Sequence, residues 1–101
     1  MPKSRTYDES LDALLRKPRD AAAYLNAALA EEDASVFLLA LRDVARVHGG
    51  IRRLADSARL NRESLYRMLS ENGNPTVSSL SALLHSMGLR LAVTPSARNR
   101  S

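Results

Sequence analysis

The segment from 59 to 70, RLNRESLYRMLS, gathers side chains that could read the bases of DNA. An arginine donates two hydrogen bonds to the edge of guanine, and a carboxylate can accept one from cytosine or orient a neighbouring arginine. A tyrosine offers its ring to the methyl group of thymine and its hydroxyl to phosphate. We therefore predict a base-reading set in this segment, made of Arg62, Glu63, Tyr66 and Arg67.

Basic and hydroxyl-bearing residues around this set could hold the phosphates of the same duplex. Phosphate oxygens accept hydrogen bonds from arginine, from hydroxyl groups and from the free N–H groups at the start of a helix. Two adjacent arginines precede the set, and threonine and serine follow it. The expected phosphate contacts are Arg52, Arg53, Ser64, Thr76 and Ser78.

Two short helices joined by a tight turn would position these side chains, the first over 51–58 and the second over 62–70. Such a helix-turn-helix needs a small residue within its first helix, which Ala55 provides, and a cap for its second helix, for which Asn61 is well suited. Apolar residues stand at the steps that lock the two helices together: Leu54, Ala58, Leu60 and Leu65. The pattern predicts that the second helix enters the major groove. The open alternative is a helical hairpin whose polar face simply meets water.

The turn between these helices departs from the usual pattern. A position that is often glycine is Arg59 here. A positive φ at a residue other than glycine costs about 1 kcal/mol. The turn is therefore either mildly strained or differently shaped.

Composition limits the remaining choices. The chain has 101 residues, 45% of them hydrophobic and few aromatic, which suits one domain with a modest aliphatic core of packed helices. The absence of cysteine excludes disulfides, thiolate catalysis and a thiolate zinc site. No apolar signal core opens the chain and no run reaches membrane-spanning length. We expect a cytoplasmic protein without a membrane partner.

Basic charge is concentrated in the part of the chain that holds the reading set. Residues 1–33 carry five basic and seven acidic side chains, net −2. Residues 34–67 carry seven arginines and three acidic side chains, net +4, and residues 68–101 are net +2. A surface that binds a polyanion requires such a bias. The alternative is that these arginines only solvate helix faces.

The other segments complete a predicted all-α domain over 1–101. Residues 1–10 are polar and expected to fray, and Tyr7, Leu11, Leu14 and Leu15 are expected to pin a short turn or helix onto the body. Helices are predicted over 18–30, 34–47 and 77–87 by apolar residues at three- and four-residue spacing. The helix over 34–47 has a broad apolar face and should be central and largely buried. In this division 6–33 is a helical extension, 34–88 is the helix-turn-helix core and 96–101 is a loose tail.

After the last helix the spacing changes. Leu89, Leu91 and Val93 alternate with polar or small residues, which is typical of a strand over 89–95. One strand alone cannot satisfy its backbone groups, so the same strand of a second copy is its simplest partner. The expected fold is therefore five helices with a short C-terminal β-strand, paired across a homodimer. An extended tail lying on the body is the alternative.

Nothing in the sequence favours an enzyme. His48 and His85 stand apart without a carboxylate at ligand spacing, so we expect no metal site and no catalytic triad. The glycines fall at helix ends and turns, not in a phosphate-binding loop, and no cofactor is expected. An acidic cluster at 8–12, made of Asp8, Glu9 and Asp12, is either a solvated face or a contact for a basic partner protein.

Several segments together resemble the addiction-module antidote family, the antitoxins of HigA type with a repressor-like helix-turn-helix. The resemblance covers about residues 6–95 and rests most of all on RESLYRMLS, GNPT and the closing MGLRL, with AAAYLNAAL and LLALRDVARVHGG before them. By position, the family's base-reading residues fall on the set predicted above. Related repressors often have glutamine where this chain has Ile51, which removes one expected backbone contact.

The resemblance implies a function. Members of this family neutralise a small toxin of the RelE/ParE class, typically a ribonuclease that cleaves messenger RNA, and repress the promoter they share with it. It therefore implies a toxin partner and a palindromic DNA operator bound by a dimer. Two alternatives stay open: a helix-turn-helix repressor without a toxin, and a module that binds only protein.

Overall fold

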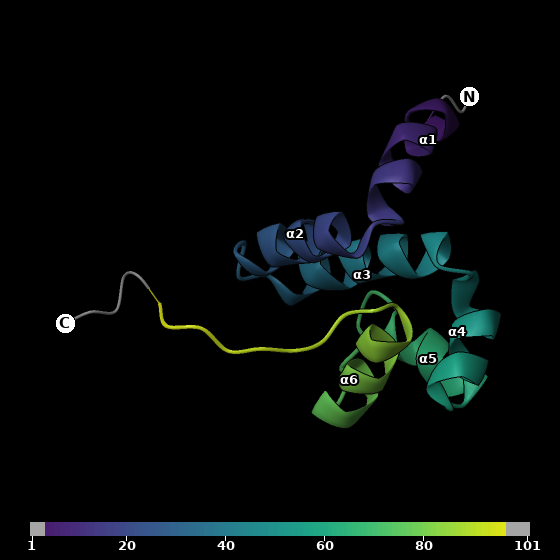
Figure 1. Ribbon diagram of the computed structural model, residues 1–101. Coiled ribbons are helices and arrows are strands. Elements are labelled where there is room, and N and C mark those ends of the chain that lie inside the picture. Colours follow the sequence, from purple (N-terminus) through teal and green to yellow (C-terminus); the bar gives the residue numbers. More distant parts are fainter. Residues whose placement is uncertain (1–3, 97–101) are drawn as a thin grey trace.

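The computed structural model describes residues 4–96, with side chains from residue 9 onward, and consists of helices joined by short connections (Figure 1). The predicted all-α class is confirmed, but the count of five helices is wrong because the described residues form six. In chain order these are α1 (Ser4–Leu15), α2 (Pro18–Leu29), α3 (Ala34–Val47), α4 (Gly50–Ala58), α5 (Arg62–Met68) and α6 (Val77–Ser86).

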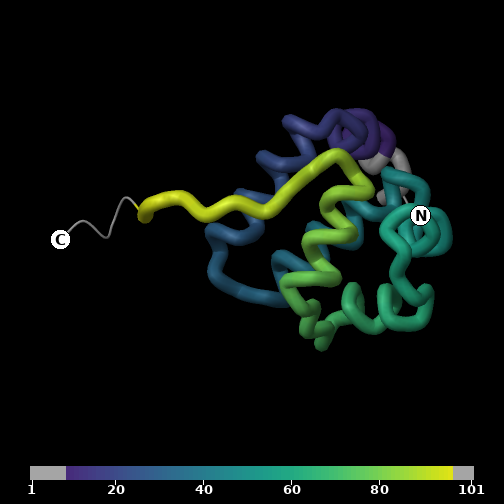
Figure 2. The backbone as a smooth tube through the Cα atoms, turned by 60° about the horizontal axis from the view of Figure 1, so that its bottom comes forward, coloured from purple at the N-terminus to yellow at the C-terminus, as the bar shows by residue number. Residues whose placement is uncertain are grey.

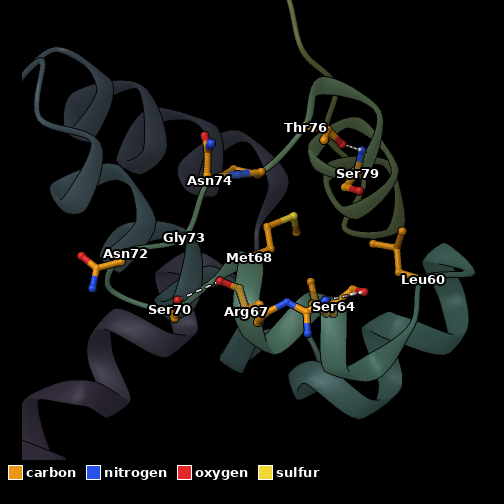
Figure 3. Close-up of a pocket in the computed structure, with 12 residues that line it drawn as sticks. Leu60, Ser64, Arg67, Met68, Ser70, Asn72, Gly73, Asn74, Thr76 and Ser79 are labelled. Carbon is orange, nitrogen blue, oxygen red and sulfur yellow. Dashed lines mark hydrogen bonds between the residues drawn. The ribbon is translucent and has the colours of Figure 1, made fainter.

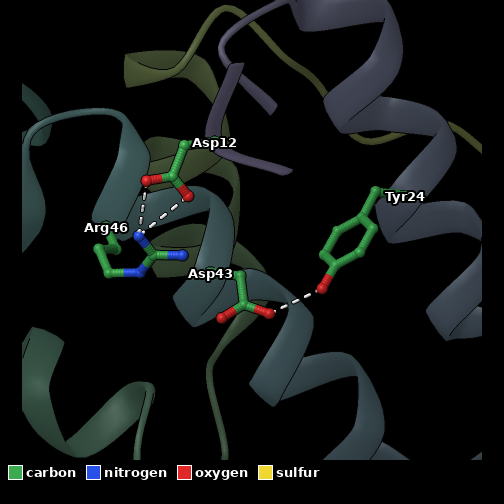
Figure 4. A network of polar contacts seen from close by, with 4 residues as sticks. All are labelled: Asp12, Tyr24, Asp43 and Arg46. Atoms are coloured by element: carbon green, nitrogen blue, oxygen red, sulfur yellow. Dashed lines mark hydrogen bonds and ion pairs between the residues drawn. The ribbon is translucent and has the colours of Figure 1, made fainter. Parts of the chain in front are cut away.

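The additional helix is α1, which is longer than the short turn or helix expected around Leu11, Leu14 and Leu15 and includes residues 4–10, which were expected to fray. Contacts distant in the sequence hold it. Leu15 is fully buried, and both carboxylate oxygens of Asp12 lie 3.0–3.1 Å from Nη1 of Arg46 on α3 (Figure 4). Nε2 of His48 also lies 2.9 Å from the carbonyl oxygen of Leu15 and donates to it, since a carbonyl can only accept. The polar N-terminal segment is therefore stabilised as a helix by contacts with α3 and with His48 at its end.

The predicted C-terminal strand is wrong. Within the described part of the chain no strand forms, and residues 89–96 continue as an extended segment without a ladder. Its start is fixed because the amide of Leu89 donates to the carbonyl of Leu84 at 2.8 Å. Beyond that the segment runs along α2 and then leaves the body, where no second strand of this chain is available (Figure 2). Of the predicted tail over 96–101, only residue 96 is described.

The helices form two groups around one core. Helices α1, α2 and α3 pack on one another, whereas α5 and α6 both pack against α4, which also contacts α3. Helices α1, α2 and α3 lie in the upper part of Figure 1 and α4, α5 and α6 in the lower part, and the connection between α2 and α3 is far from α4 and α5. Fully buried leucines from both groups meet in the single apolar cluster: Leu15, Leu41, Leu54, Leu65, Leu69 and Leu83.

The predicted central helix, α3, is covered on only part of its apolar face. Its buried residues are Leu38, Ala40, Leu41, Val44 and Ala45. Val36 and Leu39 stay 36% and 52% exposed, although they continue the same apolar pattern. The expectation of a largely buried helix therefore holds for the second half of α3 and fails near its start.

Three helices begin with the side-chain caps that the sequence contains. Asp33, Asn61 and Thr76 each accept a hydrogen bond from a backbone N–H in the first turn of α3, α5 and α6, at 2.9, 3.0 and 3.0 Å. Such a cap satisfies a donor that has no partner inside the helix. The caps fix where α5 and α6 begin, and so fix the surface between them.

Candidate nucleic-acid interface

A tight turn with one strained residue joins α4 to α5. Arg59 has φ 59° and ψ 42°, a left-handed conformation that glycine adopts more easily. The amide of Leu60 donates to the carbonyl of Ala55 at 2.8 Å, which closes the end of α4. Of the two alternatives for this turn, the strained one is therefore correct. Asn61 then caps α5, so the second helix begins where the sequence predicts.

The apolar residues predicted to lock the two helices point inward. Leu54 and Ala55 of α4 and Leu65 of α5 are between 1% and 3% exposed, and Ala58 and Leu60 are half-buried. The small side chain of Ala55 lets α5 approach α4 closely. This contact turns the opposite face of α5 outward and holds it against a rigid support.

All four predicted base-reading residues lie on that outward face. Arg62, Glu63 and Arg67 are exposed, and Tyr66 is 57% exposed. Arg67 reaches back along the helix, with its Nη2 atom 3.4 Å from the hydroxyl of Ser64. The side chains are thus free to meet base edges, and their backbone is fixed from behind.

The five residues predicted to contact phosphate are also exposed, but they stand on three different elements. Arg52 and Arg53 lie in the first turn of α4, Ser64 lies on α5, and Thr76 and Ser78 lie at the start of α6. The hydroxyl of Thr76 accepts from the amide of Ser79 and keeps its own hydrogen available as a donor. The first N–H groups of α6 point in the same direction as this cap.

An open cleft of about 430 Å³ separates α5 from α6 (Figure 3). The structure brings three of the predicted residues to this cleft, namely Ser64, Arg67 and Thr76. It does not bring Arg52, Arg53 or Ser78 to it. Several polar side chains of the lining could meet a sugar–phosphate backbone, and those that the sequence analysis missed are Ser70, Asn72 and Asn74. The signal that could have found them is the connection 71–76, ENGNPT, whose turn residues must bend between two capped helices.

Gly73 sets the shape of that connection. A Cβ atom built at Gly73 would lie 2.1 Å from the carbonyl oxygen of Met68 and 2.9 Å from that of Arg67. Any side chain would therefore push the connection away from the end of α5. The backbone passes close to α5 only because glycine stands here, and the width of the cleft depends on it.

Other kinds of site find no support among the described residues. No three histidine, aspartate or glutamate side chains between residues 9 and 96 gather where they could hold a metal ion. Asp12 of the predicted acidic cluster is engaged by Arg46, Glu9 is exposed, and the side chain of Asp8 lies outside the described residues. No helix in residues 4–96 combines the length and apolar character needed to cross a membrane.

Comparison with known proteins decides the family. Residues 6–95 match the family described as "Probable addiction module antidote protein". The chain belongs to this family. The resemblance to antidote proteins predicted from the sequence is thereby confirmed. An antidote implies a toxin as its partner and a regulatory role without catalysis.

One curated protein is similar to most of the chain. An uncharacterized protein of Haemophilus influenzae is 36% identical over 73 residues, which cover 72% of this chain and 74% of that protein. No solved structure matches the chain. The assignment to the antidote family therefore rests on sequence similarity. The arrangement of α4 and α5 comes from the structure and is not part of the family description.

Proposed function

We propose that this protein is a sequence-specific DNA-binding antitoxin of HigA type. It acts in the cytoplasm, neutralises a toxin of the RelE/ParE class and represses the promoter of its own operon. One observation carries the DNA-binding part: α5 presents Arg62, Glu63, Tyr66 and Arg67 outward from a capped, rigidly supported helix. The toxin part is supported by membership of the antidote family.

Binding to DNA would proceed with α5 in the major groove. Arg62 and Arg67 are the candidates for guanine, and Glu63 and Tyr66 for cytosine and thymine. The cleft beside α5 would admit the phosphate backbone, where Thr76 and Arg67 can donate hydrogen bonds. Arg52, Arg53 and Ser78 would hold phosphates outside the cleft.

A homodimer on a palindromic operator fits the size of this surface. One short helix can contact only a few base pairs, so useful specificity needs two copies. Two reading helices about 34 Å apart would meet half-sites separated by one turn of the duplex. Because each phosphate contact releases counterions, affinity should fall steeply as salt rises.

Fluorescence anisotropy with duplex DNA from the protein's own promoter tests the DNA-binding part, with scrambled duplex as the reference. The wild type should prefer the promoter sequence at every salt concentration, and the double variant Arg62→Ala/Arg67→Ala should lose that preference. The matched control is Arg16→Ala/Arg19→Ala, which removes the same charge from exposed positions at the start of α2 and just before it. Equal affinity for scrambled DNA, or an unchanged double variant, would leave only a protein-binding role.

A rescue experiment tests the toxin part. Induced expression of the small protein encoded beside this one should arrest growth, and co-expression of this protein should restore it. Rescue by the double variant that no longer binds DNA would separate neutralisation from repression. Absence of any toxic neighbour would instead reduce the function to that of a repressor.

A further inference from the structure

A second surface, at the opposite end of the molecule from α5, has the features of a protein-docking site. Between α2 and α3 lies a hollow of about 270 Å³. Val36, Leu39 and Ala40 of α3 form one side of it, at the spacing that places residues on one helix face. Val36 and Leu39 are 36% and 52% exposed, so a contiguous apolar stripe meets solvent here.

The hollow exists because the two helices meet through alanine. Ala27 and Ala28 of α2 face Ala40 of α3 across it. These side chains are too short to fill the space between the helix backbones. A partner could therefore insert one larger apolar side chain between the helices without moving either of them.

The rim of the hollow is acidic. From residue 20 to residue 41 the chain contains four acidic side chains and no lysine or arginine. Glu31 lines the hollow, and Glu32 and Asp33 stand beside it in the exposed connection to α3. At the other end Asp43 accepts a hydrogen bond of 2.7 Å from Tyr24 (Figure 4). An apolar centre with a charged rim is the usual arrangement of a protein interface.

We propose that this hollow between α2 and α3 is the surface that docks the toxin, which presents an apolar anchor surrounded by basic side chains. The proposal rests on the proposed function, because a toxin that cleaves RNA must carry a cationic surface to hold its phosphates. The acidic rim complements such a surface.

A second copy of this chain fits the hollow less well. A two-fold dimer brings the same patch of both copies into one interface. The three consecutive carboxylates at 31–33 would then face their own counterparts. Like charges brought together oppose association, whereas a basic partner neutralises them.

The position of the hollow has a regulatory consequence. In both views the connection between α2 and α3 lies away from α4 and α5, and among the described helices α2 packs only against α1 and α3 (Figures 1 and 2). Toxin and DNA therefore occupy separate faces. The antitoxin should hold both at once, so that the toxin remains neutralised while the promoter is repressed.

The binding of the purified neighbouring-gene product to the full-length protein tests the proposal by calorimetry. Leu39→Asp places a charge in the hollow and should weaken toxin binding about tenfold or more, while promoter binding and Tm stay unchanged. Leu14→Asp is the matched control. It makes the same chemical change at a residue of α1 that is 46% exposed and lies outside the hollow. Ala27→Tyr fills the hollow from α2 and should weaken toxin binding to a similar extent. It replaces Leu39→Asp in the experiment if that variant does not fold.

A separate variant tests the contribution of the acidic rim to toxin binding. Glu31→Gln/Glu32→Gln removes two carboxylates, spares the cap Asp33, and should weaken toxin binding and flatten its dependence on salt. A wild type that does not bind the neighbouring-gene product at all would overturn the proposed toxin function itself. If the wild type binds but the hollow variants bind equally well, or if Leu14→Asp weakens binding instead, only the docking surface is overturned.

Discussion

Two turns, one in each half of the molecule, share a strained backbone and carry opposite charges. Glu32, between α2 and α3, has φ 58°, and Arg59, between α4 and α5, has φ 59°. Within residues 4–96 they are the only residues other than glycine with positive φ. Glycine would be less strained at both positions. Each half thus keeps a charged side chain on its surface at some cost in stability.

The two halves of the molecule also present different kinds of surface. The half made of α4, α5 and α6 is basic, and its exposed face consists of polar side chains held by caps. The half made of α1, α2 and α3 has an apolar hollow with an acidic rim. The first arrangement suits the evenly charged backbone of DNA. The second suits a protein, which can supply both an apolar anchor and complementary charge.

The largest effect should come from the core that joins the halves. Leu41 is fully buried on α3 and belongs to the same cluster as Leu54 and Leu65. Leu41→Ala leaves a cavity and should lower the free energy of unfolding by about 2–5 kcal/mol. Urea denaturation followed by circular dichroism should still give one transition, with both halves lost together. Two separate transitions would mean that the halves are independent units.

A change at Gly73 should affect the basic half alone. Gly73→Ala forces the connection 71–76 away from the carbonyl oxygen of Met68, at a cost of about 1–3 kcal/mol in stability. Widening the cleft should also weaken binding to the promoter, while toxin neutralisation continues. Val77→Ala, at the first position of α6, is the control, since Val77 is 75% exposed and does not line the cleft. Promoter affinity equal to that of the wild type would show that the cleft does not meet DNA.

Local features of both halves could be predicted from the sequence. The caps Asp33, Asn61 and Thr76 act within three residues, and the buried side of α5 follows from the spacing of Leu65 and Met68. Both depend on interactions that the neighbouring sequence contains. The predicted reading set is exposed for the same reason, because it is the opposite side of that helix.

Features that depend on distant contacts could not be predicted. The length of α1 depends on Arg46, which lies 34 positions from its partner Asp12. The exposure of Leu39 depends on which part of α3 the other helices happen to cover. The alternation in 89–95 resembles a strand, but a strand also needs a second one beside it. The spacing of apolar residues shows which face of an element is apolar, but it does not show which other element covers that face.

Replacing each strained turn residue by glycine should have a smaller effect on stability. Arg59→Gly and Glu32→Gly should each raise the free energy of unfolding, by about 0.5–1 kcal/mol, because left-handed strain disappears while the unfolded chain gains some freedom. Arg59→Gly removes a basic side chain from the half proposed to bind DNA and should weaken only promoter binding. Glu32→Gly removes a carboxylate from the rim of the hollow and should weaken only toxin binding. Thermal denaturation and the two binding assays together check this. A loss of stability in either variant would show that the side chain contributes more than its strain costs.

The smallest effect should be a dependence on pH in the acidic half. The hydroxyl and the amide of Ser35 donate to the carboxylate of Asp33 at 2.7 and 2.9 Å, which lowers the pKa of Asp33 below its ordinary value of 3.8. A lowered pKa in the folded state means that the ionised cap stabilises the fold above pH 3.8. That contribution is lost as the pH falls through the lowered pKa. Asp33→Asn keeps an acceptor that does not titrate, so the difference in unfolding free energy between wild type and variant should change only in this acidic range. Parallel curves from neutral to acidic pH would mean that the cap does not depend on the charge of Asp33.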